Sequence, residues 1–305
     1  MIDQLFDPNV TDHSDMYIGC FDGYGWDQIK YLVNSLDRSG FAGRKVMIVL
    51  GTDKATVEKL ASKDWKVAHF GKIDPNGNYV GEQVNVPVHV LRFHYLSYLL
   101  EKLPANQKPE FVITTDVRDV VFQKDPFTSL RDYARSHPFL GFIAASESMR
   151  YQDEPWGNRN LLETFGPFVH GKYMNCEMYN VGVLAGTRQA IQELSQTIFE
   201  MSHGRKIKIV DQAVFNFIIN QKIFSSNILK LPSEAGWAAQ LGTTGDTKMA
   251  AVFAPLLMEP SPILKQVGQS HKVFTSDGST EFSIVHQYER IPAWRLLLEE
   301  QYNDR

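Results

Sequence analysis

Residues 111–119 read FVITTDVRD, an apolar run that ends in charged residues. The first five residues have the composition of a short strand buried in the middle of a sheet. Asp116 follows directly, where the chain leaves that strand, and Asp119 comes three residues later. Because open α/β sheets bind ligands beyond the carboxyl ends of their strands, this stretch predicts an α/β fold with a polar site at the two aspartates.

The segments before this stretch alternate short apolar runs with stretches of helical periodicity, which is the pattern of β-α-β units around a largely parallel sheet. The longest helix is expected over 87–103, where apolar residues recur at three- and four-residue spacing and Pro104 follows. Thr52 or Asp53 can cap a helix through its side-chain oxygen. We further expect strands over 16–21, 45–50 and 65–70 and a helix over 26–38.

The second half of the chain has a less regular pattern. We expect strands over 139–145 and 179–185, a helix over 187–202 that Thr187 caps, and a helix over 210–220. The acidic and aromatic segment 146–167 predicts a long loop or short helices over the sheet, and 232–283 is rich in loops. Together the elements predict a single Rossmann-like α/β domain over 1–305, with a central, mostly parallel mixed sheet flanked by helices.

Composition limits the classes of partner. Of the 305 residues 43% are apolar, and the formal net charge of −4 gives no general attraction to the phosphates of nucleic acids. Residues 1–15 are polar and acidic and lack the apolar core of a signal peptide. The sequence holds no stretch of roughly 20 apolar residues, the length that a membrane span needs. We therefore expect a cytoplasmic protein without a membrane span and without a nucleic-acid partner.

The segment from Asp116 to Asp119 has two interpretations. Carboxylates at a strand end can hold Mg²⁺ or Mn²⁺, and they can equally cap a helix or pair with Arg118. In an extended segment residues three apart face opposite sides, so both aspartates reach one ion only if the chain turns between them. Otherwise Asp116 reaches the ion without Asp119 and, as the family likeness described below implies, binds it with His286, or Arg118 supplies positive charge in its place.

Three further features each have a structural and a functional interpretation. Asn180 and Gly182 interrupt an apolar run, which indicates either a bulge or a close approach by a ligand. Asp211 and Gln212 begin a helix, where Asp211 can serve as a simple cap. His286 ends a short apolar run and Arg290 follows, a pattern that suits a metal and a phosphate as well as a solvated surface.

These pieces, in this order, resemble the GT-A-fold glycosyltransferases that use nucleotide-diphospho-sugars, and the likeness is closest to the glycosyltransferase family 8 type. That type carries a late H-x-x-G-x-x-K-P-W segment. Here the run from His286 to Trp294 keeps the His and the Trp at the same separation, while Glu289 replaces the Gly and Pro292 is shifted by one. Arg290 can take over the diphosphate-binding role of the Lys. The family motif is usually D-x-D, whereas this chain has D-x-x-D.

The resemblance implies a metal site for Mn²⁺ or Mg²⁺ and a donor site for a nucleotide-diphosphate sugar, with a UDP-sugar favoured. The metal ligands would be Asp116, Asp119 and His286. The donor site would lie in the half formed by 16–130. Its residues would be Asp22 and Tyr24 in a base-binding loop where the Tyr stacks on the nucleobase, with Arg92, Asp116 and Arg290.

The resemblance also implies a reacting face in the half formed by 131–305. Asn180, Asp211 and Gln212 would line it near the anomeric carbon and the acceptor. Glu147, just after the apolar run FIAAS, would bind the acceptor or, in an inverting enzyme, act as a general base. The acceptor would be a glycan or another molecule with a hydroxyl group, and the likeness favours retention of configuration.

Two other functions fit parts of the pattern. A non-catalytic protein on the same scaffold would bind sugar nucleotides or carbohydrates without turnover, although the joint presence of the candidate carboxylates and His286 argues for catalysis. A magnesium-dependent phosphohydrolase also uses aspartates at a strand end. It would need a nucleophilic Asp early in the chain, whereas Asp116 follows several β-α units.

Overall fold

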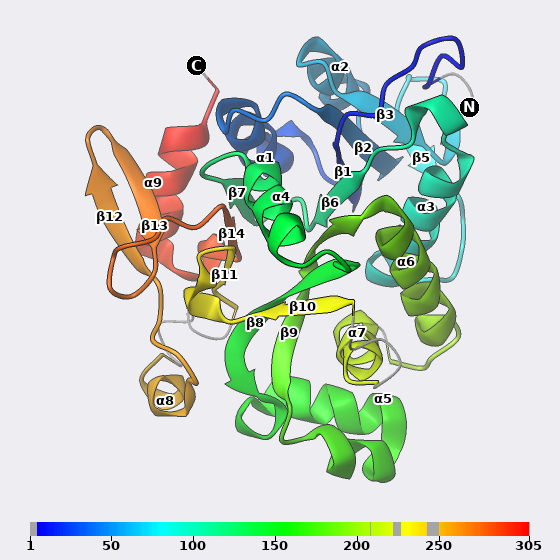
Figure 1. Cartoon of the computed structure of the whole chain (residues 1–305). Coiled ribbons are helices and arrows are strands. Elements are labelled where there is room, and N and C mark those ends of the chain that lie inside the picture. Colours follow the sequence, from blue (N-terminus) through cyan, green and yellow to red (C-terminus); the bar gives the residue numbers. More distant parts are fainter. Residues whose placement is uncertain (1–4, 208, 222–226, 243–249, 305) are drawn as a thin grey trace.

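The computed structural model describes residues 5–207, 209–221, 227–242 and 250–304. Its centre is a seven-stranded sheet with the strand order β10-β8-β9-β6-β1-β2-β3 (Figure 1). The strands are β1 (Met16–Asp22), β2 (Arg44–Gly51), β3 (Lys66–His69), β6 (Phe111–Thr115), β8 (Phe142–Arg150), β9 (Glu177–Thr187) and β10 (Ile228–Leu231). Strand β9 runs antiparallel to both of its neighbours, and the other four pairs are parallel. The predicted α/β class with a mostly parallel mixed sheet is therefore confirmed.

Helices cover both faces of this sheet. They are α1 (Trp26–Arg38), α2 (Lys54–Ser62), α3 (Val88–Lys102), α4 (Pro126–Ser136), α5 (Pro155–Tyr173), α6 (Arg188–Ser202), α7 (Asp211–Ile219), α8 (Ala250–Phe253) and α9 (Pro292–Tyr302). Successive strand residues face opposite sides, so β1 supplies both cores. Ile18 packs in one core with Leu96 and Leu99 of α3, and Tyr17 packs in the other with Ile29 of α1.

Local sequence signals predict the bounds or caps of several elements closely. Helix α1 and strand β6 have the predicted bounds. Asp53 caps α2, and its carboxylate accepts a hydrogen bond from the backbone N–H of Thr56 at 2.8 Å. Thr187 caps α6 as predicted, accepting from the backbone N–H of Ala190. Short-range chemistry therefore determines where these elements begin.

The segment 146–167, predicted to be a long loop or short helices, is divided between a strand and a helix. Residues 146–150 continue β8, and Ser146 pairs with Tyr179 of β9. Helix α5 starts at Pro155 and contains a kink at Gly166, whose φ of 78° is in the left-handed region. The helical alternative therefore holds from Pro155 onward. For 146–150 the prediction was wrong, because the pairing with β9, which is distant in sequence, overrides the weak strand preference of Ser and Glu.

A second, three-stranded sheet brings the C-terminal part of the chain to the main sheet. Its order is β11-β14-β7, with β7 (Val120–Phe122), β11 (Ala238–Gln240) and β14 (Ile284–His286). In its register His286 lies opposite Val120, the residue that follows Asp119. Two hairpins complete the strands: β4 (Gly71–Ile73) with β5 (Tyr79–Gly81), and β12 (Ile263–Val267) with β13 (Ser270–Phe274). The second hairpin, β11 and α8 lie within the region predicted to be rich in loops.

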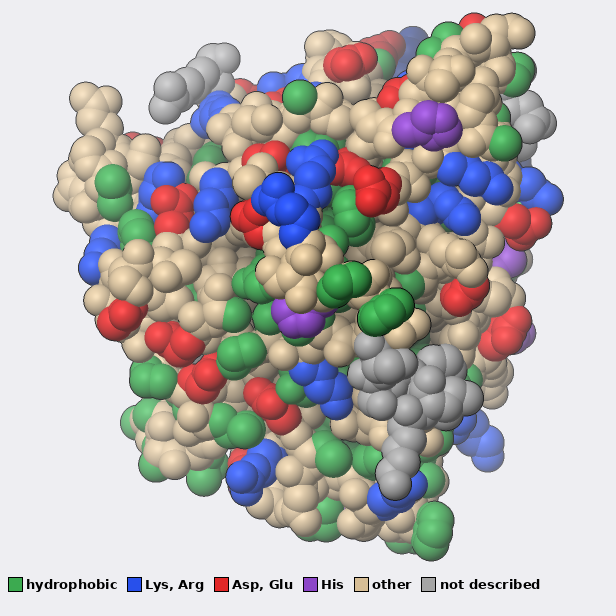
Figure 2. All heavy atoms as spheres, in the orientation of Figure 1, with side chains coloured by type: hydrophobic (Ala, Val, Ile, Leu, Met, Phe, Trp, Pro, Cys, Tyr) green, Lys and Arg blue, Asp and Glu red, His purple; other side chains and the backbone are tan. Residues whose placement is uncertain are grey.

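The surface gives no sign of a large charged field. Figure 2 shows one face of the molecule, on which acidic and basic side chains are intermixed over the part that the structure describes. Within the described ranges, no helix combines the length and the apolar composition that crossing a bilayer requires.

Candidate functional site

A cleft of about 610 Å³ opens beyond the carboxyl ends of β1 and β6. The residues predicted for the site all line it: Asp22, Tyr24, Arg92, Asp116, Asp119, Glu147, Asn180, Asp211, Gln212, His286 and Arg290. They come from seven separate segments of the chain, and the topology brings them together. The cleft therefore lies where open α/β sheets bind their ligands.

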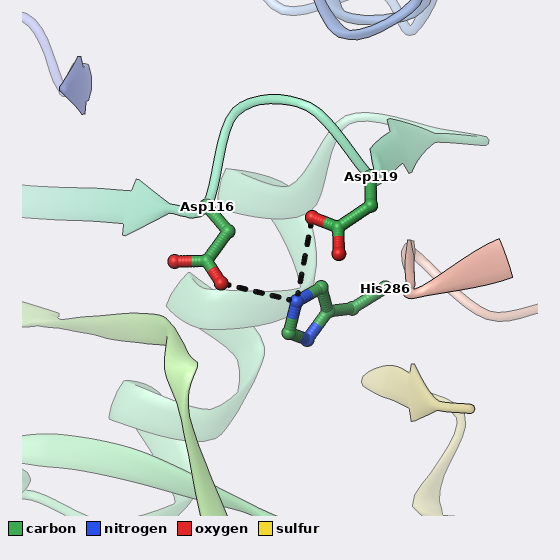
Figure 3. A group of neighbouring side chains, drawn as sticks. All are labelled: Asp116, Asp119 and His286. Atoms are coloured by element: carbon green, nitrogen blue, oxygen red, sulfur yellow. Dashed lines mark ion pairs between the residues drawn. The ribbon is translucent and has the colours of Figure 1, made fainter. Parts of the chain in front are cut away.

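The segment from Asp116 to Asp119 turns, which is required if both aspartates are to bind one ion. The chain leaves β6 at Asp116, bends over 117–119 and enters β7. The backbone N–H of Asp116 donates to the carbonyl of Gly182 at 2.8 Å, which fixes the start of the bend. Figure 3 shows both aspartates pointing toward His286. One ligand atom from each of the three residues lies within 4.8 Å of the others.

The imidazole of His286 is buried, with 1% of its surface exposed. Its Nδ1 donates to Oε1 of Gln240 at 2.7 Å, so in the neutral ring the lone pair of Nε2 is free. Nε2 lies 3.4 Å from Oδ2 of Asp116 and 3.7 Å from Oδ1 of Asp119 and makes no hydrogen bond within the described chain. A buried, unpartnered nitrogen beside two carboxylate oxygens is a donor set that fits Mn²⁺ or Mg²⁺.

The charges of the cluster shift its pKa values in different directions. Burial would lower the pKa of His286, but the carboxylates of Asp119 and Asp116 outweigh it and raise that pKa. Burial, together with the nearby Asp116, raises the pKa of Asp119. For Asp116 the effect of desolvation is outweighed by Arg92 and His286, so its pKa is lowered. Asp116 is thus the carboxylate that stays ionised most readily.

Gly182 combines the two interpretations that its sequence context left open. The register between β8 and β9 shifts here, since Ala144 pairs with Leu184 and Ala145 with Asn180, so 181–183 form a bulge. A Cβ at Gly182 would lie 2.5 Å from Cε1 of His286 and 2.8 Å from a carboxylate oxygen of Asp116. The missing side chain is therefore what lets the strand approach the cluster.

Arg92 joins two carboxylates in the cleft. Its guanidinium forms an ion pair with Asp116 and a second with Oδ2 of Asp211 at 3.2 Å. Asp211 is the first residue of α7 and Val210 occupies the cap position, so Asp211 is not the simple helix cap that was the alternative interpretation. Burial raises the pKa of Asp211, and Arg92 opposes that rise.

The floor of the cleft carries a buried carboxylate with two amide partners. Oε1 of Glu147 accepts from Nδ2 of Asn180 at 2.9 Å and from Nε2 of Gln212 at 2.6 Å. The amide oxygen of Asn180 accepts from the backbone N–H of Gly182 at 2.7 Å. Burial raises the pKa of Glu147 in spite of the two hydrogen bonds. These contacts connect the bulge at 181–183, which lies beside Asp116 and His286, to the start of α7.

The remaining predicted residues lie at the rim near β1 and the C-terminal segment. Tyr24 is half-buried, and its ring stacks on Phe21 with centroids 6.1 Å apart. Asp22 is exposed at the end of β1. Arg290 is exposed, and its guanidinium makes no ion pair with any residue that the structure describes. That group is therefore available to an anionic ligand.

Sequence reasoning missed several residues that shape the cleft. Gln240 orients His286, but nothing in its short strand signals this, because the contact arises only when β11 pairs with β14. Trp156 also lines the cleft. The sequence shows that its segment is aromatic but predicts no role for this side chain. Arg118, which the sequence offered as a partner of the two aspartates, instead pairs with Glu289 at 2.6 Å and so ties the acidic bend to the segment after His286. Glu289 stands where the resembling family has a glycine.

Comparison with known proteins gives a fold relationship. A scan of protein-family models finds no match, and a search of curated proteins finds none. Among solved structures, the WbbM bifunctional glycosyltransferase is similar with a TM-score of 0.58 and 14% identity, covering 98% of this chain and 51% of that one. Mouse xyloside xylosyltransferase 1 gives a TM-score of 0.49 and 14% identity, covering 89% of this chain and 97% of that one. The chain spans about half of the length of the WbbM protein. The similar structures are thus glycosyltransferases, and the likeness at this identity is one of fold.

Proposed function

We propose that the chain is a glycosyltransferase that moves a sugar from a nucleotide-diphosphate sugar, with a UDP-sugar favoured, to a hydroxyl acceptor. The observation that carries this proposal is the convergence of Asp116, Asp119 and the unpartnered Nε2 of His286 in a cleft beyond the strand ends. The fold likeness to a glycosyltransferase supports it. The family 8 type, the use of Mn²⁺ or Mg²⁺ and the two-half organisation at 16–130 and 131–305 belong to the same proposal.

The metal end of the cleft would hold the diphosphate of the donor. A divalent ion bound by Asp116, Asp119 and His286 would supply positive charge that stabilises the leaving diphosphate. Arg290 has a free guanidinium at the rim and would donate paired hydrogen bonds to phosphate oxygens. Arg92 is engaged by two carboxylates and so would position Asp116 as well as face the nucleotide.

The rim near β1 would hold the nucleoside. Phe21 covers one side of Tyr24, and the tyrosine ring remains half-buried at the cleft. A nucleobase stacked on that ring would gain an aromatic contact with little loss of side-chain freedom. Asp22 is exposed next to it, where its carboxylate would accept hydrogen bonds from the base or the ribose.

The floor of the cleft would hold the reacting groups. Asn180 and Gln212 keep the carboxylate of Glu147 in one position. Because burial raises the pKa of Glu147, that carboxylate accepts a proton more readily than an exposed glutamate. We therefore propose that Glu147 accepts a hydrogen bond from the acceptor hydroxyl; in an inverting reaction it would also take up the proton of that hydroxyl. Asp211 would face the sugar near the anomeric carbon, with retention of configuration as the family likeness favours.

A donor panel tests the proposal. The folded protein would be mixed with UDP- and GDP-sugars, with Mn²⁺ or with EDTA, and release of the nucleoside diphosphate would be measured. We expect release from one donor class with Mn²⁺ and its loss with EDTA. Donor binding without release across the panel would instead support the non-catalytic alternative, and release of inorganic phosphate would support a phosphohydrolase.

A further inference from the structure

The first turn of α5 forms a wall of the cleft that the proposed donor site does not use. Helix α5 lies beside the ends of β8 and β9 that are distant from β1 (Figure 1). Trp156 lines the cleft from this turn and is 49% exposed, an unusual state for so large an apolar side chain. Ile209 also lines the cleft and is 42% exposed. An exposed apolar pair inside a polar cleft indicates a ligand contact.

The backbone around Trp156 is fixed, so its exposure does not come from a loose segment. The carboxylate of Glu154 accepts hydrogen bonds from the backbone N–H groups of Trp156, at 3.0 Å, and of Gly157. Four residues further along, the amide of Asn160 donates to the carbonyl of Ile209. Because Glu154 already satisfies the first N–H groups, the helix start is not itself an anion site.

The charge near this wall selects against a phosphate. Of the charged side chains that line the cleft, Glu154 and Glu147 are the two closest to Trp156 in sequence, and both are buried. The arginines that line the cleft come from elsewhere: Arg92 from α3, Arg118 from the acidic bend and Arg290 from the segment after β14. A ligand on this wall is therefore expected to be neutral, because carboxylates repel an anion.

The wall continues directly into the reacting floor. The hydroxyl of Tyr151, which precedes α5, contacts the carbonyl of Gln212 at 3.5 Å, and the side chain of Gln212 bonds Glu147. The apolar indole of Trp156 thus lines the same cleft as a carboxylate and amide groups that can bond hydroxyls. A pyranose ring has the matching chemistry, since its C–H face is apolar and its edge carries hydroxyl groups.

We propose that Trp156 is the platform on which a pyranose ring of the acceptor stacks, and hence that the acceptor is a carbohydrate. This inference rests on the proposed glycosyl transfer and assigns the acceptor side of the same cleft. Trp156 is a specificity residue: it holds the sugar with its hydroxyl toward Glu147 and takes no part in donor binding. A neutral sugar on an aromatic face accounts for the exposed tryptophan, the acidic surroundings and the short path to Glu147.

Direct binding tests the platform without any turnover. The indole N–H resonance of Trp156, assigned with Trp156→Phe, would be followed by NMR during titration with methyl pyranosides of glucose, galactose, mannose and xylose. The titrations would be run with and without Mn²⁺ and UDP or GDP. We expect a saturable shift with at least one pyranoside. If no sugar of the panel moves this resonance, the platform is overturned.

Kinetics then separate the acceptor from the donor. With the pyranoside that binds as acceptor, Trp156→Ala should raise the acceptor KM by about tenfold, the size of a lost aromatic contact, and leave the donor KM unchanged. Trp156→Phe should recover most of the loss. Phe168→Ala is the matched control, because Phe168 is 87% exposed on the same helix and lies outside the cleft lining. An equal rise in the donor KM would contradict the assignment.

The two proposals fail in different ways. A saturable shift of the Trp156 resonance without consumption of any nucleotide sugar would refute the transfer reaction and support the sugar site. Consumption of a nucleotide sugar without any such shift would support the transfer reaction and overturn the sugar site.

Discussion

The two ends of the cleft satisfy their polar groups in different ways. At the metal end, two carboxylates and a buried imidazole meet, and Nε2 of His286 has no hydrogen-bond partner in the described chain. At the floor, Glu147 already accepts hydrogen bonds from Asn180 and Gln212. The metal end therefore offers a donor set that a cation can bind, whereas the floor holds its carboxylate in place through its own amide groups.

The difference teaches which contacts are made by the fold and which await a ligand. Like charges crowd together only where something offsets their repulsion. Here Arg92 offsets part of it at Asp116. The carboxylates also raise the pKa of His286, so that a proton on this imidazole would offset more at acidic pH. A bound metal ion would replace that proton. Both ends line one cleft, so one substrate can span them.

The largest expected effect comes from removing a ligand at the metal end. We expect Asp116→Ala and His286→Ala to lower donor turnover by roughly 100-fold or more, because each removes support for the charge of the leaving group. The initial rate of nucleoside diphosphate release measures this, and circular dichroism checks the fold. Asp132→Ala is the control, since that aspartate lies 59% exposed on α4 outside the cleft. Full activity in both ligand variants would remove the metal assignment.

The sequence predicts the first half of the fold well because its signals are local. Helical periodicity gives α1 its bounds, and the apolar composition of β6 gives that strand its bounds. The continuation of β8 through Ser146 and Glu147 could not be predicted in this way. Ser146 becomes strand because it pairs with Tyr179 of β9, and both polar residues are buried there.

The candidate site likewise contains residues that local sequence signals predict and residues that they do not. The placement of Asp116 beyond a buried strand follows from the sequence, because a strand end at the sheet is where such a fold binds ligands. Its meeting with His286 was expected only through the family likeness, because 170 positions separate the two in the chain. Gln240 could not be predicted, since its role exists only in the register between β11 and β14.

A second prediction concerns that orienting contact. Gln240→Leu removes the acceptor for Nδ1 of His286, so the ring loses its fixed orientation and we expect Mn²⁺ affinity to fall by about 10- to 100-fold. Isothermal titration calorimetry with Mn²⁺ alone measures this. Gln240→Glu keeps an acceptor and should retain affinity. Gln196→Leu changes a surface glutamine of α6 and serves as the control. Unchanged Mn²⁺ affinity in Gln240→Leu would show that the metal end needs no support from β11.

The smallest expected effect lies at the floor and concerns stability against pH. Burial raises the pKa of Glu147 above its ordinary value of 4.5, so the folded state binds this proton more tightly than the unfolded state. The contribution of Glu147 to the free energy of unfolding is then most favourable below pH 4.5 and is lost as the pH rises through the folded-state pKa. Glu147→Gln does not titrate, and its amide oxygen can still accept from Asn180 and Gln212.

We therefore expect Glu147→Gln to be more stable than the natural chain near neutral pH by about 1 kcal/mol, the usual size of a single-residue effect, with the difference vanishing in acid. Urea unfolding between pH 4 and pH 8 measures it. Asp116→Asn should show the opposite trend, because Arg92 and His286 outweigh desolvation and lower the pKa of Asp116. The carboxylate of Asp116 thus adds stability above its ordinary value of 3.8, which the asparagine loses. If the stability difference from the natural chain changes with pH in the same direction for both variants, the pKa values of Asp116 and Glu147 are not shifted in opposite directions.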